Sequence, residues 1–304
     1  MVMIKRVLAL LGSGALAILL LRQAETAAQA VRDGVQLCLT SVIPALFPFF
    51  AVSSLLVALG AAEAAGRVLA HPFRRLFRCG GAGCAALLLG LVGGYPVGAR
   101  TAAELVRRGE LSPAEGARLL TFCNNAGPAF AIGVAGVSVF GSARTGGWLY
   151  LLHCAAALLT GLLFCRRPLP VTAMPKRPVP PQTGLTGQFL RAVEGAVSAM
   201  ARVCGFVVFF LVLLRLAEGL IGPLPPLAAG VLELTNGILR LTSDRRGIVT
   251  AAALLGWGGL SVHCQTAAVT AGSGISLRLY LPAKAVQAAL SAGLAALLAP
   301  YLLP

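Results

Sequence analysis

Charged residues are scarce in this chain of 304 residues. They make up 12% of the sequence, whereas hydrophobic residues make up 58%. A soluble domain is about one quarter charged. Several apolar runs also reach the roughly 18 residues that are needed to span a bilayer. These proportions exclude an ordinary soluble protein and predict an all-α protein that crosses the cell membrane several times.

Acidic residues are especially few, with 10 Asp and Glu against 25 Lys and Arg. The Arg residues cluster in short segments between apolar runs, where the positive-inside rule places cytoplasmic loops. This distribution argues against a nucleic-acid partner. Part of the net charge of +15 favours anionic substrates or lipid headgroups. The expected partners are therefore the lipid bilayer and a small anion.

Catalytic motifs and phosphate-binding loops are missing from the sequence. It contains no HExxH, GxSxG or paired Asp motif, and no P-loop. Most of the eight cysteines lie in apolar runs, where Cys is usually a packing residue. Cys79 and Cys84 are spaced too loosely to indicate a metal site. We expect no enzyme activity, no metal and no cofactor, so any transport energy must come from a gradient or a partner.

The alternation of apolar and polar segments divides the chain into four parts. Residues 1–21 are predicted to form an N-terminal transmembrane helix that begins in the cytoplasm. Residues 22–165 form a first repeat, and residues 186–304 form a second one. Between them, residues 166–185 form a Pro-rich linker that we place in the cytoplasm.

Helix-breaking residues interrupt an apolar run at residues 93–101, GGYPVGART. Gly and Pro continue a helix poorly. Irregular backbone at membrane depth persists only where protein buries it or where it lines a wet cavity. Basic segments on both sides of the run predict a re-entrant hairpin instead of one straight span. Arg100 is costly in hydrocarbon, and it is therefore a candidate functional residue.

A second break is predicted at residues 122–130, FCNNAGPAF. Ser112, Pro113 and Glu115 have the spacing of a helix start, and the helix they begin runs into this stretch. Two adjacent amides followed by Gly and Pro inside an apolar run indicate an unwound helix. We expect its polar groups to face inward.

The second half repeats this order with ELTNG at residues 233–237 and WGGLSVHCQT at residues 257–266. In the alignment of the halves, Gly93-Gly94 pairs with Gly258-Gly259, and Arg100 pairs with Gln265. Counting membrane crossings gives the two halves opposite orientations. The fold class expected is therefore two inverted repeats, each with spanning helices and a re-entrant, broken helical hairpin, as in secondary transporters.

One set of residues disagrees with this topology. Arg240, Arg245 and Arg246 would lie on the outer side of the membrane, against the positive-inside rule. Either these residues are functional, or the hairpin of the second half is placed wrongly.

These motifs, in this order, resemble those of a known family. GYPVGAR at 94–100, FCNNAGP at 122–128 and the two later motifs are similar to the YlbJ sporulation integral membrane proteins. That family lies within the nucleoside-recognition (Gate) group. The group is distantly similar to concentrative nucleoside transporters, which have two re-entrant hairpins.

The resemblance implies a multi-pass protein of the cell membrane in endospore-forming bacteria. The implied role is export of dipicolinic acid from the mother cell toward the forespore, across the outer forespore membrane. A homo-oligomer and other sporulation membrane proteins are candidate partners. The alternatives are a carrier of nucleosides or other metabolites, and a non-transporting scaffold or gate subunit of a sporulation complex.

A site for dipicolinate, a planar dianion, needs positive charge and N–H donors. Arg100 can hold one carboxylate, and free N–H groups at the start of the helix after the Gly-rich turn favour anions. The predicted substrate-binding residues are Gly94, Tyr95, Gly98, Arg100, Thr101, Asn124, Asn125, Thr235, Asn236, Ser261, His263 and Gln265. Glu104 and Glu233 are awkward beside an anion, and they are candidates for coupling a cation or a proton.

Structural roles compete with several of these assignments. Arg100 and Glu104 are four residues apart, so they can form a salt bridge on one helix face. Asn124 and Asn125 can join helices by hydrogen bonds without contacting a substrate. His263 can be a packed, hydrogen-bonded histidine, and Glu233 can cap a helix or pair with an Arg.

Overall fold

The computed structural model describes residues 2–165 and 184–302, and in this part of the chain the regular structure is entirely helical. Most of the predicted linker, residues 166–183, lies outside the described residues. Five helical stretches are long and apolar enough to cross a membrane: Ala24–Leu56, Ala143–Phe164, Leu185–Ile221, Arg245–Thr270 and Tyr280–Leu298. The expected all-α, multi-pass membrane protein is confirmed.

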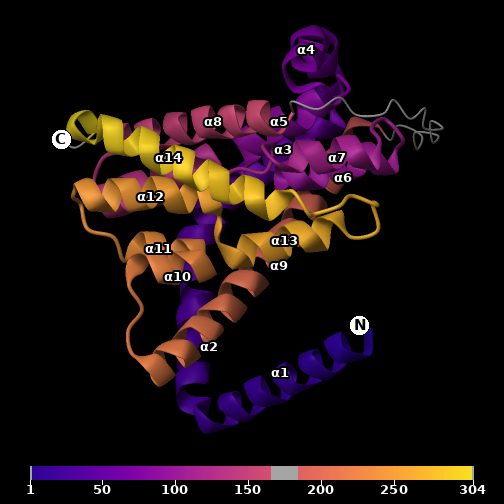
Figure 1. Cartoon of the computed structure of the whole chain (residues 1–304). Helices are drawn as coiled ribbons and strands as arrows, with labels where there is room; N and C mark the ends of the chain where they lie inside the picture. Colours follow the sequence, from indigo (N-terminus) through magenta and orange to yellow (C-terminus); the bar gives the residue numbers. More distant parts are fainter. Residues whose placement is uncertain (1, 166–183, 303–304) are drawn as a thin grey trace.

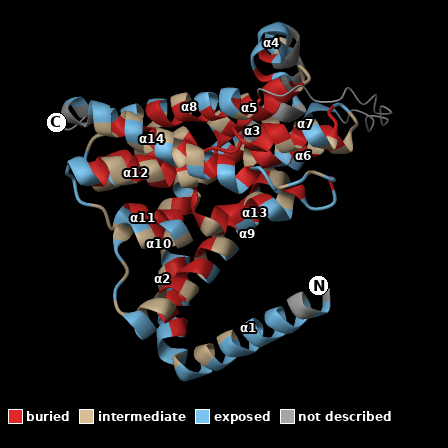
Figure 2. Ribbon diagram, in the orientation of Figure 1, coloured by how far each residue is buried: buried red, intermediate tan, exposed pale blue. Residues whose placement is uncertain are grey.

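The N-terminal helices lead from the projecting α1 into the body of the molecule, where α3 lies beside α5 (Figure 1). They are α1 (Val2–Arg22), α2 (Ala24–Leu37), the π-helical η1 (Cys38–Val42) and α3 (Ile43–Ala58). Helix α1 extends away from the body and is mostly exposed (Figure 2). It is helical as expected but is not among the five candidate spans, so its crossing of the membrane stays a prediction. Helices α2 and α3 pack along α9.

The first predicted break lies between two short helices. The next elements are α4 (Ala61–Phe77), α5 (Gly83–Gly93) and α6 (Val97–Arg107). Helices α5 and α6 have 11 residues each, which is about 16 Å and too short to cross a bilayer of roughly 30 Å. They pack against each other, and a Cβ at Gly90 would lie 2.9 Å from the Cα of Gly98. The pair has the shape of a hairpin, and its depth in the membrane stays a prediction.

The second predicted break is also present. The first half ends with α7 (Pro113–Leu120), the π-helical η2 (Ala129–Val139) and α8 (Ala143–Phe164). Helix α7 starts with the expected capping box, in which Ser112 accepts from the Glu115 N–H and Glu115 accepts from the Ser112 N–H. The helix stops at Leu120, and residues 121–128 are irregular before η2 begins. The sequence GPAF thus opens a new helix instead of bending the old one.

The second half contains α9 (Leu185–Ile221), α10 (Pro226–Leu232), α11 (Leu234–Leu239), α12 (Arg245–Trp257), α13 (Gly259–Thr270) and α14 (Tyr280–Leu302). Its hairpin differs from the expected one. Helix α12 packs mainly on α14, whereas α13 packs on α6 and α9. Gly258 and Gly259 both have positive φ, at 91° and 81°, and they redirect the chain between the two helices. The helices that fold back on each other are α10 and α11, where Gly237 packs on Gly230.

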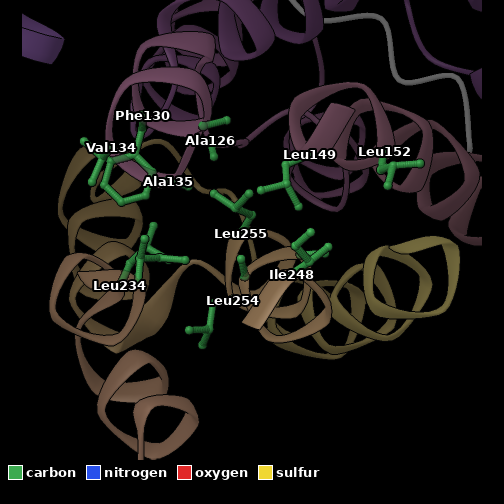
Figure 3. Close-up of a cluster of buried hydrophobic side chains, with 14 of the residues drawn as sticks. Ala126, Phe130, Val134, Ala135, Leu149, Leu152, Leu234, Ile248, Leu254 and Leu255 are labelled. Atoms are coloured by element: carbon green, nitrogen blue, oxygen red, sulfur yellow. The ribbon is translucent and has the colours of Figure 1, made fainter. Parts of the chain in front are cut away.

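A buried apolar cluster joins the two halves (Figure 3). It combines Phe130 and Ala135 of η2 with Leu149 of α8, Leu234 of α11 and Leu255 of α12. All five side chains are at most 8% exposed. This cluster fixes the irregular segment at 121–128 against the helices of the second half, and the polar site described next adjoins it.

Candidate functional site

The two glycine-containing breaks that the sequence aligns are in contact. Tyr95, in the turn between α5 and α6, donates from Oη to the carbonyl oxygen of Leu255 in α12 at 2.9 Å. A Cβ at Gly258 would lie 3.1 Å from the same Oη. At the other end, Arg107 of α6 donates to the carbonyl of Val269 at 2.9 Å. Helices α6 and α13 therefore run side by side in the same direction, starting from a common point. The opposite membrane orientation of the halves stays a prediction.

A pocket lies where the broken segments converge. It is lined by Val42, Leu46, Gly94, Tyr95, Ala126, Gly127, Phe130, Val203, Val207, Glu233, Leu234, Thr235, Ser261, Val262 and Gln265. Its volume of about 50 Å³ holds a few water molecules. An aromatic dianion needs more space, so the surrounding helices must separate to admit one. Six of the predicted residues form part of the wall, namely Gly94, Tyr95, Glu233, Thr235, Ser261 and Gln265.

Two polar groups of the pocket wall lack a partner. Ser261 is 0% exposed and Gln265 is 3% exposed. Neither the Ser261 Oγ nor the Gln265 Oε1 has a hydrogen-bond partner among the described residues. Buried polar atoms are rarely left unsatisfied, so these two atoms mark a place for a ligand or for water. An apolar wall with a few convergent polar groups is typical of a small-molecule site.

A buried lysine that the sequence motifs did not include lies behind this pocket. Lys284 of α14 is 0% exposed. Its Nζ lies 2.7 Å from the Gln287 Oε1, 3.0 Å from the Asn124 carbonyl oxygen and 3.3 Å from the Tyr95 Oη. The same Nζ is 5.3 Å from the centre of the Tyr95 ring, within the range of a cation–π contact. Tyr95 thus connects Lys284 to the pocket wall.

The hydrogen bonds around Lys284 have the geometry expected for an ammonium ion. Tyr95 uses its only O–H group to donate a hydrogen bond to the Leu255 carbonyl. Its Oη therefore accepts a hydrogen bond from the Lys284 Nζ. The Asn124 backbone carbonyl can only accept. Gln287 donates from Nε2 to the Asn125 Oδ1 at 2.9 Å, which leaves its Oε1 facing Lys284.

Asn125 fixes the orientation of that glutamine. It donates from Nδ2 to the Phe122 carbonyl at 2.7 Å, so its Oδ1 must be the acceptor for Gln287. Three acceptors therefore surround Nζ, and an ammonium group has the three N–H donors that satisfy all of them at once.

No carboxylate balances this charge within residues 2–165 and 184–302, where Lys284 forms no ion pair. Glu233 lines the pocket, but its Oε2 accepts from the Asn236 backbone N–H and side-chain Nδ2, both at 2.8 Å. Glu233 thus caps α11, as one of its structural alternatives predicted. The sequence did contain an indication of Lys284, because an ionisable residue inside an apolar span is a functional candidate by default.

Asn124 and His263 belong to a second polar network beside Lys284. Asn124 donates from Nδ2 to the Thr266 Oγ1 at 2.8 Å and to the Tyr280 Oη at 3.1 Å. The His263 Nδ1 lies 3.2 Å from the same Tyr280 oxygen. The Asn124 Oδ1 and the His263 Nε2 lack a partner in the described part of the chain. These contacts join the first half to the second, and they leave two polar atoms free for a ligand.

Arg100 does not lie in the pocket wall. It is exposed on α6, where its Nη2 would be 3.4 Å from a Cβ at Gly195 of α9. The expected arrangement of Arg100 opposite Gln265 across the pocket is therefore absent. The alternative ion pair with Glu104 is not formed either, and Glu104 pairs instead with Arg108 at 2.8 Å and with Arg107 at 3.9 Å.

Three further predicted residues have structural contacts, two within their own helix and one with another segment. The Thr101 Oγ1 donates to the Val97 carbonyl one turn earlier, at 2.9 Å. Asn236 is half-buried and bonds Glu233. Gly98 packs against the Cys123 carbonyl, where a Cβ would overlap it. In this conformation, the structure gives these residues local or packing contacts.

Comparison with known proteins supports the family resemblance seen in the sequence motifs. Residues 39–143 match the family model for nucleoside recognition (Gate). That segment includes both breaks of the first half and excludes Lys284. The chain is also 27% identical over 311 residues to the sporulation integral membrane protein YlbJ of Bacillus subtilis (strain 168), covering 85% of this chain and 74% of the relative. No solved structure matches the chain. Together the two matches confirm the resemblance of this multi-pass membrane protein to YlbJ and to the nucleoside-recognition (Gate) group.

Proposed function

We propose that the protein carries a small organic anion across the membrane, and that dipicolinate is its substrate. The observation that carries the proposal is the fully buried ammonium group of Lys284, which has no acidic partner among the described residues. Burying a charge costs several kcal/mol, and hydrogen bonds to neutral groups offset only part of this cost. A substrate carboxylate that enters the adjoining pocket supplies the missing negative charge.

The arrangement around the pocket suits such a carrier. Broken helices that meet at one point are typical of the substrate sites of secondary transporters. Ser261 and Gln265 offer unpartnered polar groups on the pocket side, and Tyr95 lies between the pocket and Lys284. The similarity to YlbJ supports a role in sporulation. In that setting dipicolinate moves from the mother cell toward the forespore, through the outer forespore membrane.

Uptake of labelled dipicolinate by liposomes that contain the purified protein tests the proposal. We expect saturable uptake by the wild type and at least a tenfold loss in Lys284→Met, which keeps the side-chain length but removes the charge. Ser291→Ala is a matched control, because Ser291 is also 0% exposed on α14 and its Oγ has no partner within the described residues. Uptake no faster than in protein-free liposomes would refute dipicolinate as the substrate.

A nucleoside is the second candidate, and the position of Glu233 favours it. Glu233 is the one ionisable acid in the pocket wall, and the wall contains no Lys or Arg from the described residues. A buried carboxylate can accept hydrogen bonds from ribose hydroxyls. If uridine is taken up and dipicolinate is not, the nucleoside assignment replaces the anion assignment.

A further inference from the structure

We infer that Lys284 takes the place of a coupling cation: its ammonium group occupies a monovalent-cation site made of oxygen atoms from two broken segments and from α14. The consequence for transport rests on the proposed carrier function, whereas the cation site itself does not. The inference predicts that the protein does not need Na⁺ or K⁺ at this position, because a tethered cation is always present.

The ligands of this site come from separate parts of the chain. Tyr95 belongs to the turn between α5 and α6, and the Asn124 carbonyl belongs to the irregular segment at 121–128. Gln287 lies one turn after Lys284 on α14. Carriers that are driven by ions use carbonyl groups of unwound helices to coordinate Na⁺ or H⁺. Here the carbonyl of the irregular segment accepts a hydrogen bond from a lysine instead.

The site has the chemistry of a monovalent-cation site. All three contacting atoms are neutral oxygens that accept, at 2.7 to 3.3 Å from Nζ. The orientation of Gln287 is fixed by Asn125, which in turn is fixed by the Phe122 carbonyl. The oxygens are therefore held in place by contacts that do not depend on Lys284. Removing the lysine side chain leaves a preformed set of acceptors with space for a small cation.

A tethered cation changes how such a carrier can be driven. A soluble cation orders the broken helices only when it is bound, and its own gradient then contributes energy. Lys284 is covalently part of α14 and cannot cross the membrane. Transport therefore runs down the gradient of the substrate, without coupling to Na⁺ or K⁺ through this site.

Thermal unfolding of the purified protein tests the site without any substrate. We expect the wild-type unfolding temperature to be the same in the chloride salts of Na⁺, K⁺ and choline at equal ionic strength. Lys284→Ala should be less stable, and it should regain about 2 °C in methylammonium or ethylammonium at roughly five times the dissociation constant. Lys284→Met fills the same space and should not respond. Ser291→Ala creates no cation site and should not respond either.

Two results would overturn the inference. One is a wild-type protein that Na⁺ or K⁺ stabilises relative to choline, since a soluble cation would then bind as well. The other is a folded Lys284→Ala protein that no alkylammonium, Na⁺ or K⁺ stabilises. Lys284→Ala is purified in ethylammonium chloride as well as in choline chloride, and a variant that folds in neither salt would also count against the inference. Failure of the proposed function can be told apart from failure of this inference. In the first case dipicolinate uptake is absent, but alkylammonium ions still stabilise Lys284→Ala.

Discussion

The Tyr95 Oη donates a hydrogen bond to the carbonyl of Leu255 at 2.9 Å, across 160 residues of sequence. Helix α12 ends at Trp257, so the Leu255 carbonyl is one of the last four, which have no partner within the helix. The phenol satisfies this carbonyl and at the same time accepts a hydrogen bond from Lys284. One side chain therefore joins the first break, the end of α12 and the buried cation.

Tyr95→Phe should lower the stability of the protein by about 1–3 kcal/mol, because it leaves the Leu255 carbonyl and one Lys284 proton without a partner in a buried place. Thermal unfolding in detergent measures the change. Tyr150→Phe is the matched control, since Tyr150 also donates to a helix-end carbonyl, that of Leu91, at 3.0 Å but is only half-buried. Equal losses for the two variants would show that the Tyr95 contact has no special role.

Gln287→Glu should abolish anion uptake while the protein still folds. The new carboxylate would lie where the Gln287 Oε1 is now, 2.7 Å from Nζ, and would neutralise Lys284. Gln287→Met is the control for the lost hydrogen bond. Like the Glu variant it loses the hydrogen bond to Asn125, but it adds no negative charge. We expect dipicolinate uptake to fall at least tenfold in the Glu variant and clearly less in the Met variant. Wild-type uptake in Gln287→Glu would show that the positive charge is not used.

Gly98→Ala should reduce the amount of folded protein in the membrane rather than alter its substrate preference. A Cβ at Gly98 would overlap the Cys123 carbonyl at the start of the irregular segment. Gly205→Ala is the control, because no atom lies within 4 Å of a Cβ there. The α9 helix should tolerate it or gain slightly in stability. A Gly98→Ala protein with normal stability but no uptake would instead support the substrate-binding role expected from the sequence.

The breaks in the chain were predictable because they depend on local chemistry. Gly and Pro disfavour helix, and Ser112 with Glu115 has the spacing of a capping box. Both features act within a few residues, so the sequence contains all the information needed. The contact between the two glycine-containing breaks followed from aligning the halves, because similar segments in a repeat occupy related places.

Side-chain direction was less predictable, because it depends on how each helix is rotated against its neighbours. Arg100 lies near the predicted break, but the rotation of α6 turns it toward Gly195 and away from the pocket. Lys284 has no motif around it, and two of its three partners, Tyr95 and Asn124, are more than 150 positions away. Such long-range partners are fixed by packing of the whole fold. The ionisable residue in an apolar run was the only local indication of its role.

Arg240 is one of the basic residues that disagree with the expected topology. Arg240 donates two hydrogen bonds to the carboxylate of Glu218 and so joins the end of α11 to the end of α9. The two side chains are 24% and 12% exposed. Arg240 thus has a structural partner that accounts for a charge in this position.

Arg240→Met should therefore destabilise the protein by about 1–2 kcal/mol, less than the loss of a fully buried pair, because water reaches both groups. Arg215→Met is the matched control, since Arg215 contacts the same carboxylate at 3.2 Å but is 42% exposed. It should change stability by less than about 0.5 kcal/mol. Substrate uptake per folded molecule should be unchanged in both variants. Lost uptake in a stable Arg240→Met protein would show that this arginine contributes directly to transport, and that the charge at this end of the molecule does more than hold α9 and α11 together.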